Sequence, residues 1–122
     1  ERDKEKGGKW VKGKSGDTFG PLGPYLVTKD EIKNIFNLDL NLDLNGKRRQ
    51  TGNTSSMIFN FNFLISHLSS FITLMPGDII TTGTPPGVGL GMNPPQFLNE
   101  GDEMSLKVDN LGEQKTKILK EK

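Results

Sequence analysis

The chain has 122 residues, of which sixteen are basic and fifteen acidic, so its formal net charge is +1. Nucleic acid and anionic membrane surfaces usually bind proteins with a basic excess, so the near-neutral balance argues against both as partners. The sequence contains no cysteine, which excludes a disulfide framework and a thiolate metal site and fits a reducing cytoplasm. No apolar run approaches the roughly 18 residues that a membrane span needs.

The composition favours strands and turns over long helices, because the chain has fifteen glycines, seven prolines and no alanine. The length fits one domain rather than two. Only 32% of the residues are hydrophobic, so we expect a thin core, or a core completed by a partner or by further chain. The sequence begins at Glu1 rather than at methionine, from which we expect the middle of a longer gene product or a trimmed chain.

Residues 14–24 have the highest density of reactive side chains, since a lysine, a serine, an aspartate and a threonine precede a run rich in glycine and proline. Such a run predicts a shaped loop of the kind that often carries binding residues, although a plain solvated connection is the simpler local interpretation. The charged residues 1–13 would fray if they stood alone, or they form the tail of an element that begins before Glu1. After the loop, residues 25–27 are a candidate strand, and Thr28 with Glu31 forms a capping-box pattern for a turn or two of helix.

The clearest strand signal lies in residues 38–44, where leucine alternates strictly with aspartate or asparagine. This segment runs into Asn45-Gly46, the favoured dipeptide of a type I′ turn. The return strand is expected over residues 47–53. The sequence therefore predicts a β-hairpin over residues 38–53.

A helix is predicted after the hairpin, because Asn60 is a suitable N-cap and apolar residues recur at helical spacing until Pro76-Gly77. A second glycine- and proline-rich loop occupies residues 83–95. Further strands are expected over residues 78–82, 104–108 and 113–119. About five or six strands with one main helix indicate a mainly β, α+β domain.

Taken one at a time, the polar residues give weak functional signals. His67, the only histidine, shares helical register with apolar residues, so a core or interface role is favoured over metal ligation. Residues 87–91 (GVGLG) resemble a dinucleotide fingerprint, but the prolines that follow block the helix that this motif requires. No pair of carboxylates is spaced to hold a hard cation, so we expect no metal ligand in this chain. Residues 14–18 and 81–84 offer a lysine and threonine hydroxyls that suit a small anionic oxo-acid.

These local signals follow one another in a specific order. Over nearly its whole length the sequence resembles the fumarylacetoacetate hydrolase family. Six segments carry the resemblance: residues 13–24 (GKSGDTFGPLGP), 38–46 (LDLNLDLNG), 50–59 (QTGNTSSMIF), 76–78 (PGD), 82–89 (TGTPPGVG) and 101–102 (GD). Six linked motifs in order are far more specific than any one of them.

The resemblance implies an incomplete mixed β-roll or β-sandwich of the family's C-terminal type. It also implies a homodimer and a Mg²⁺, Mn²⁺ or Ca²⁺ ion that binds the substrate's carboxylate and 2-oxo group as a Lewis acid. Family members hydrolyse, decarboxylate or isomerise 2-oxo or 1,3-dioxo acids. On this pattern Lys14 matches the active-site lysine and Thr18 the residue that supports the metal side. Thr84 matches the threonine that holds the substrate carboxylate, and Arg2 matches a substrate-side arginine.

The sequence also departs from the family pattern. Glu5 stands where glutamine is usual, and Gly16 stands where phenylalanine is commoner. The family's Glu-x-Glu pair, its metal-binding aspartate and its His/Glu acid–base pair would lie upstream of Glu1. We therefore expect residues 1–122 to form a single partial catalytic domain, truncated on its N-terminal side.

The expected function is that of a fragment of a cytoplasmic, metal-dependent enzyme that acts on small oxo-acids through a metal- and lysine-stabilised enolate. The alternative is a catalytically inactive remnant that only self-associates or binds a partner. Edge strands left unpaired by truncation would invite such association.

Overall fold

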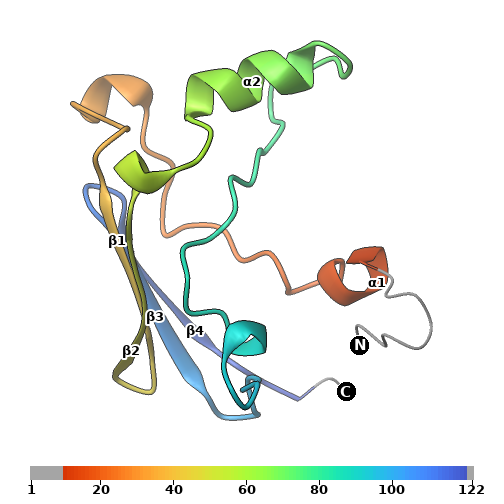
Figure 1. The fold of residues 1–122 in the computed structure, drawn as a ribbon, viewed down its shortest axis with the longest axis vertical. Helices are drawn as coiled ribbons and strands as arrows, with labels where there is room; N and C mark the ends of the chain where they lie inside the picture. The colour runs from red at the N-terminus through yellow and green to blue at the C-terminus, as the bar shows by residue number, and fades with distance from the viewer. Residues whose placement is uncertain (1–9, 121–122) are drawn as a thin grey trace.

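A computed structural model describes residues 10–120 of the chain (Figure 1). Four antiparallel strands form one sheet in the order β2-β1-β3-β4, with one main helix, α2, beyond one end of the sheet. The elements are α1 (Trp10–Lys14), β1 (Asp39–Leu44), β2 (Lys47–Asn53), α2 (Phe61–Ser69), β3 (Glu103–Val108) and β4 (Gly112–Lys117), with single 3₁₀ turns at Lys29–Glu31, Thr54–Ser56 and Gly89–Gly91. The predicted fold class, mainly β with one main helix, is confirmed.

The β1–β2 hairpin forms where the sequence predicts it. Asn45 and Gly46 occupy the turn with φ of 51° and 73°, the left-handed conformation that a type I′ turn requires at both central positions. The side chain of Asn45 also joins the turn to the start of β3. Its amide donates to Asp102 Oδ1 at 2.8 Å, and its Oδ1 accepts from the backbone N–H of Glu103 at 2.9 Å.

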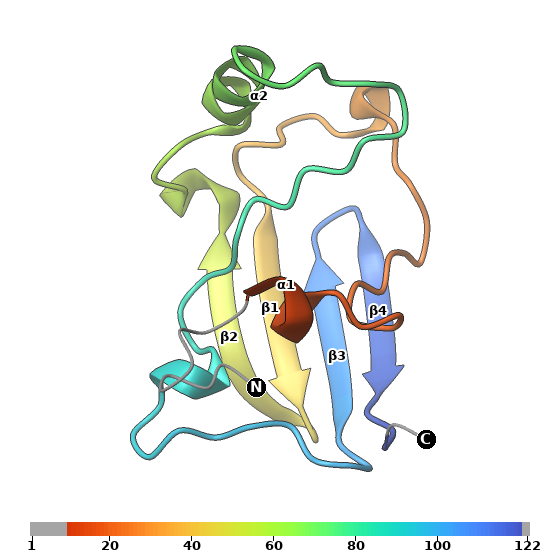
Figure 2. The same cartoon turned by 90° about the vertical axis from the view of Figure 1, so that its right-hand side faces the viewer.

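One face of the sheet is apolar and the other polar, because side chains alternate along each strand. On the apolar face, the β1 leucines Leu40, Leu42 and Leu44 lie opposite Val108, Leu106 and Met104 of β3. On the polar face, Arg48 forms an ion pair with Asp43 at 2.5 Å and donates to Asn41. Figure 2 shows α1 in front of β1 and β3, on the side of the sheet where residues 82–91 also lie.

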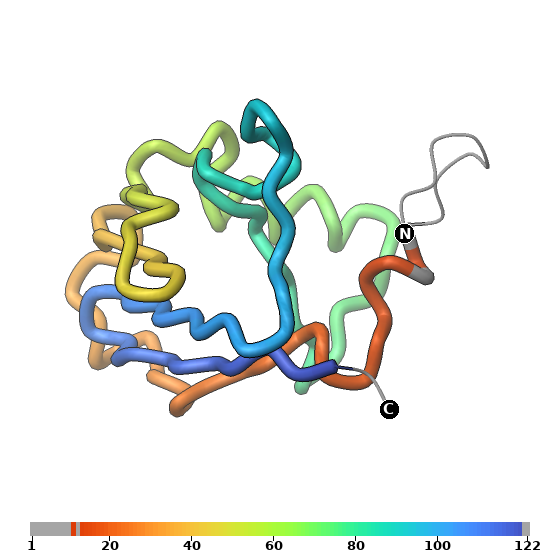
Figure 3. Tube along the Cα trace, turned by 90° about the horizontal axis from the view of Figure 1, so that it is seen from below, coloured from red at the N-terminus to blue at the C-terminus, as the bar shows by residue number. Residues whose placement is uncertain are grey.

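The core is as thin as the composition predicts. Leu38, at 6% exposure, is the one buried hydrophobic residue among those described. The chain exposes 10399 Å², whereas a compact monomer of 13.5 kDa exposes about 6,500 Å². Seen from below, the strands and α1 occupy opposite sides of the molecule (Figure 3). The apolar face of the sheet is therefore only half-buried.

Two predicted strands are wrong, so the described sheet has four strands rather than five or six. Residues 25–27 run beside β4 without pairing: Tyr25 packs against Gly112, and the Gln114 amide donates to the carbonyl of Gly23 at 3.1 Å. Residues 78–82 belong to no helix or strand, and Ile79 is 64% exposed. A strand needs a ladder partner for its backbone groups, and neither segment pairs with a strand of the described sheet.

Around the helices, the sequence predictions need two corrections. Residues 10–14 form the short helix α1, so the end of the charged segment does not fray and the loop begins after Lys14. The N-cap of α2 is confirmed, since Asn60 Oδ1 accepts from the backbone N–H of Phe63 at 2.9 Å. His67 is exposed and stacks beside Phe63, with ring centroids 6.0 Å apart, which excludes the core role. None of the helices within residues 10–120 has the length and hydropathy to span a bilayer.

Replacing Leu38 by alanine should lower the free energy of unfolding by about 2 kcal/mol or more, because the truncation leaves a cavity at the most buried apolar site. The matched control is Leu26→Ala, since Leu26 is 94% exposed. That substitution should change the unfolding free energy by less than about 0.5 kcal/mol. Urea denaturation followed by circular dichroism measures both, and equal effects would contradict this description of the core.

Candidate functional site

The loop that contains Thr84 is held to β2 by one glutamine side chain. Gln50 Nε2 donates to Thr84 Oγ1 and to the carbonyl oxygen of Pro85, both at 2.7 Å. A carbonyl oxygen can only accept, so the bond to Pro85 fixes the orientation of the amide with its nitrogen toward the loop. Both amide hydrogens of Gln50 are then used.

This arrangement leaves the proton of the Thr84 hydroxyl available. In its bond with Gln50 the hydroxyl oxygen is the acceptor, and a threonine hydroxyl has one proton of its own to donate. Thr84 is exposed, so that proton can reach an outside acceptor. A carboxylate is the strongest such acceptor, because hydrogen bonds to an ionised group are shorter and stronger than neutral ones.

Two glycines allow the loop to approach β2 so closely. A Cβ at Gly52 would lie 2.8 Å from Pro85 Cβ, and a Cβ at Gly87, whose φ is +112°, would lie 2.0 Å from the carbonyl oxygen of Arg49. These contacts connect residues 50–59 with residues 82–89. They explain why two segments far apart in the sequence both need glycine at these points.

Thr84 lies at the rim of a cavity of about 460 Å³ between the end of β2 and the loop. The cavity is mostly apolar, with a few hydroxyl and amide groups, which is the usual character of a small-molecule site. It is lined by Leu40, Asn53, Thr54, Ser56, Met57, Ile58, Phe59, Leu64, Thr82, Gly83, Thr84, Pro85 and Pro86. Residues 50–59 and 82–89, two of the six segments that carry the family resemblance, thus form most of this cavity.

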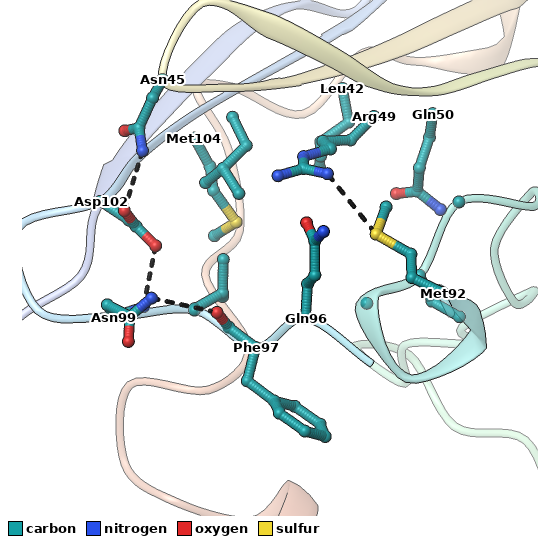
Figure 4. A pocket seen from close by; sticks show the side chains of 15 residues that line it. Leu42, Asn45, Arg49, Gln50, Met92, Gln96, Phe97, Asn99, Asp102 and Met104 are labelled. Carbon is teal, nitrogen blue, oxygen red and sulfur yellow. Dashed lines mark hydrogen bonds between the residues drawn. The ribbon is translucent and has the colours of Figure 1, made fainter. Parts of the chain in front are cut away.

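A larger cavity of about 650 Å³ lies on the other side of the same loop, toward the hairpin turn (Figure 4). Arg49 points into it from β2, beside Leu42, and donates from Nη1 to the sulfur of Met92 at 3.5 Å. The Nε of Arg49 is buried and has no partner among the described residues. Sequence reasoning gave Gln50 only as the first residue of a family motif and did not single out Arg49. The direction of both side chains depends on a register shift that the alternation of β1 does not reveal.

Asp102, at the edge of this cavity, accepts two hydrogen bonds. The backbone N–H of Asn99 and the side-chain amide of Asn45 each donate to its carboxylate at 2.8 Å. These bonds, that of Asn99 first, hold the pKa of the Asp102 carboxyl below its ordinary value of 3.8. The carboxylate thus joins the loop before β3 to the hairpin turn.

The structure does not bring the predicted site residues into one cluster. Lys14 is exposed at the end of α1, and Thr18 is exposed in the turn that follows, which the backbone bond from Phe19 to Gly16 closes at 2.9 Å. Neither residue lines the two cavities, although α1 and residues 82–91 lie on the same side of the sheet (Figure 2). The predicted substrate-side arginine, Arg2, falls outside the described residues.

The described residues do not fit a metal cage. Within residues 10–120, no three histidine, aspartate or glutamate side chains converge closely enough to hold an ion. The carboxylate of Asp102 is committed to amide donors, and Asp43 is committed to Arg48. The groups that this part of the chain offers to a ligand are therefore hydroxyls and cationic side chains rather than metal ligands.

Comparison with known proteins agrees with the fold and with the order of the segments. The family described as "Fumarylacetoacetate (FAA) hydrolase C-terminal" matches residues 1–119. The chain is 56% identical over 111 residues to the "Putative hydrolase" of Burkholderia cenocepacia, covering 90% of this chain and 39% of that protein. It thus spans about two-fifths of the length of the curated relatives it matches.

Two solved structures illustrate the similarity. The fumarylacetoacetate hydrolase of Exiguobacterium antarcticum superposes with a TM-score of 0.90 at 35% identity, covering 97% of this chain and 42% of that one. The maleylpyruvate hydrolase of Sphingobium sp. SYK-6, in complex with manganese(II) ion and pyruvate, gives a TM-score of 0.79 at 36% identity, covering 87% and 38%. The sheet and loops are thus those of an enzyme fold. The chain belongs to the fumarylacetoacetate hydrolase family, whose members are hydrolases and isomerases.

Replacing Gly87 by alanine should destabilise the protein by about 2 kcal/mol more than replacing Gly101, because only Gly87 combines strained φ with overlap of another backbone. Gly101 is the matched control, since its φ is +90° and a Cβ there meets nothing within 4 Å. Urea denaturation of the two variants gives the difference. Equal losses would show that the loop does not need its close approach to β2.

The stability of the chain should fall as the pH drops below the ordinary carboxyl pKa of 3.8, partly through Asp102. Because the pKa of Asp102 is lowered in the folded state, its contribution is complete above 3.8 and is lost as the pH falls through the lowered value. Urea midpoints measured from about pH 5 to about pH 3 test this. The Asp102→Asn variant should show a shallower pH dependence, and identical slopes would contradict the assignment.

Proposed function

We propose that the chain forms the lysine- and threonine-bearing wall of the active site in an enzyme that hydrolyses, decarboxylates or isomerises small 2-oxo or 1,3-dioxo acids. The observation that carries the proposal is the Thr84 hydroxyl, whose oxygen accepts from Gln50 and which lies at the rim of a mostly apolar cavity. Membership of the family supports the reaction class.

Each proposed residue has a role that its chemistry allows. Thr84 donates to a substrate carboxylate. The Lys14 ammonium stabilises negative charge on the substrate's oxo oxygen as the enolate develops. Thr18 supports the metal side of the site, and Arg2 binds the substrate from the segment that precedes α1.

The described residues do not fit a metal ion, so we assign the metal ligands to the part of the relatives' length that this chain does not cover. The manganese and pyruvate bound by the maleylpyruvate hydrolase of Sphingobium sp. SYK-6 support a divalent cation, Mg²⁺, Mn²⁺ or Ca²⁺, in the complete enzyme. When bound, such an ion would supply Lewis-acid polarisation. On this proposal the chain is the C-terminal part of a cytoplasmic, homodimeric enzyme.

A second candidate function is a catalytically inactive remnant that self-associates or binds a partner. The half-buried apolar face of the sheet favours it, as do the unpaired outer edges of β2 and β4 among the described residues. Unpaired edges and apolar faces are the surfaces through which sheets associate. The two candidates differ in whether Lys14 matters for turnover.

The test uses a hybrid enzyme in which this chain replaces the corresponding segment of the Burkholderia cenocepacia relative, to which it is 56% identical. With Mg²⁺ or Mn²⁺, the hybrid should turn over an acylpyruvate or oxaloacetate. Lys14→Met should lower kcat/KM by about 100-fold or more, because it removes the charge that stabilises the enolate. Lys33→Met is the matched control on another exposed segment and should leave turnover unchanged.

Two results would count against the catalytic proposal. One is a folded hybrid that turns over none of these oxo-acids while the unmodified relative does. The other is full activity of the Lys14→Met hybrid. Either result would favour the remnant, and sedimentation of the 122-residue chain would then measure its self-association.

A further inference from the structure

The structure assigns Gln50 as a positioning residue that orients the Thr84 hydroxyl, so that its proton is presented to the carboxylate of a small oxo-acid. This inference rests on the proposed function of Thr84 and extends it to a residue on β2. Two features of the described residues carry it: the direction of the hydrogen bonds at the Thr84 hydroxyl, with no competing acceptor, and the register of β2.

The first feature is the direction of the hydrogen bonds. A threonine hydroxyl can rotate, and an acceptor nearby would turn its proton away from the substrate. Gln50 presents a donor instead, because its Nε2 is fixed by the second bond to the carbonyl of Pro85. Among residues 10–120, no hydrogen bond donated by Thr84 Oγ1 is present, so its proton is not committed within the described chain.

The second feature is the register of β2. Counting back from the turn, Lys47 pairs with Leu44 and Arg48 with Asp43, but Leu42 pairs with Gln50. Arg49 is therefore an extra residue, a β-bulge. Without it, alternation would place Gln50 on the polar face opposite Asn41.

The bulge therefore moves Gln50 to the apolar face, where Thr84 lies. Bulges re-aim side chains in this way and are common next to active sites. A glutamine on a paired strand is also a rigid support, since every residue of β2 except Arg49 is paired with β1. Loop closure alone would need only the bond to Pro85, whereas the second bond acts on the hydroxyl.

A double-mutant cycle in the hybrid enzyme tests this assignment, with pyruvate as the probe and its Kd measured by calorimetry. Thr84→Val should weaken pyruvate binding about 10-fold or more, because a charge-assisted hydrogen bond is lost. Thr84→Ser retains the hydroxyl and should restore most of the affinity. Gln50→Met should weaken binding about 5-fold, because the hydroxyl loses its fixed partner.

In the Thr84→Val background, Gln50→Met should have no further effect, because the positioning role requires the hydroxyl. For an oxo-acid substrate, the Gln50→Met change should appear mainly in KM, because the carboxylate is held equally in the ground and transition states. Thr51→Val is the matched control on the polar face of β2 and should leave the affinity for pyruvate unchanged. Circular dichroism checks that each variant is folded.

Gln50→Glu supplies a second variant of nearly the same shape that replaces the donor by an acceptor. It should weaken pyruvate binding at least as much as Gln50→Met, because the hydroxyl of Thr84 would then donate to residue 50. Additive effects of Gln50→Met and Thr84→Val, or wild-type affinity in Gln50→Met, would overturn the positioning role while leaving the proposed function intact. A folded hybrid that neither binds pyruvate nor turns over oxo-acids would overturn both.

Discussion

The single extra residue in β2 is the constraint on which the site depends. Because Arg49 is unpaired in the ladder, Gln50 and Gly52 lie on the apolar face of the sheet, and Arg48 remains on the polar face with Asp43. Gly52 then accepts the ring of Pro85 at close range, and Gln50 reaches the carbonyl of Pro85 and the hydroxyl of Thr84. The register shift of one residue thus decides whether the loop that contains Thr84 finds a hydrogen-bonding partner on β2.

The same sheet explains why much of the apolar surface of the chain is exposed. Its hydrogen-bonded framework is regular, yet its apolar face is covered only near its two edges, by the loop that Gln50 holds beside β2 and by residues 23–25 beside β4. A sheet with one apolar face needs a second layer to bury it. The relatives that share this fold are more than twice as long as the chain.

The proposed site residues differ in how firmly the sheet holds them. Thr84 is attached to the sheet by hydrogen bonds and close packing, and its chemistry can be read from those contacts. Lys14 and Thr18 are exposed and lie on a helix end and a turn with few contacts to the sheet. Their position relative to a substrate therefore depends on what packs against α1. Because of this difference, a positioning residue, Gln50, can be assigned for Thr84 and not for Lys14.

The sequence by itself determined the hairpin, the N-cap of α2, the last two strands and the family, because alternation, turn dipeptides and ordered motifs are local signals. It also indicated Thr84 through residues 82–89. Only the tertiary structure decided that residues 25–27 and 78–82 form no strand, since a strand exists only with a partner. It alone revealed the direction of the Gln50 side chain, because one bulge reverses the face of every residue beyond it, and no local pattern records which face a neighbouring loop will cover.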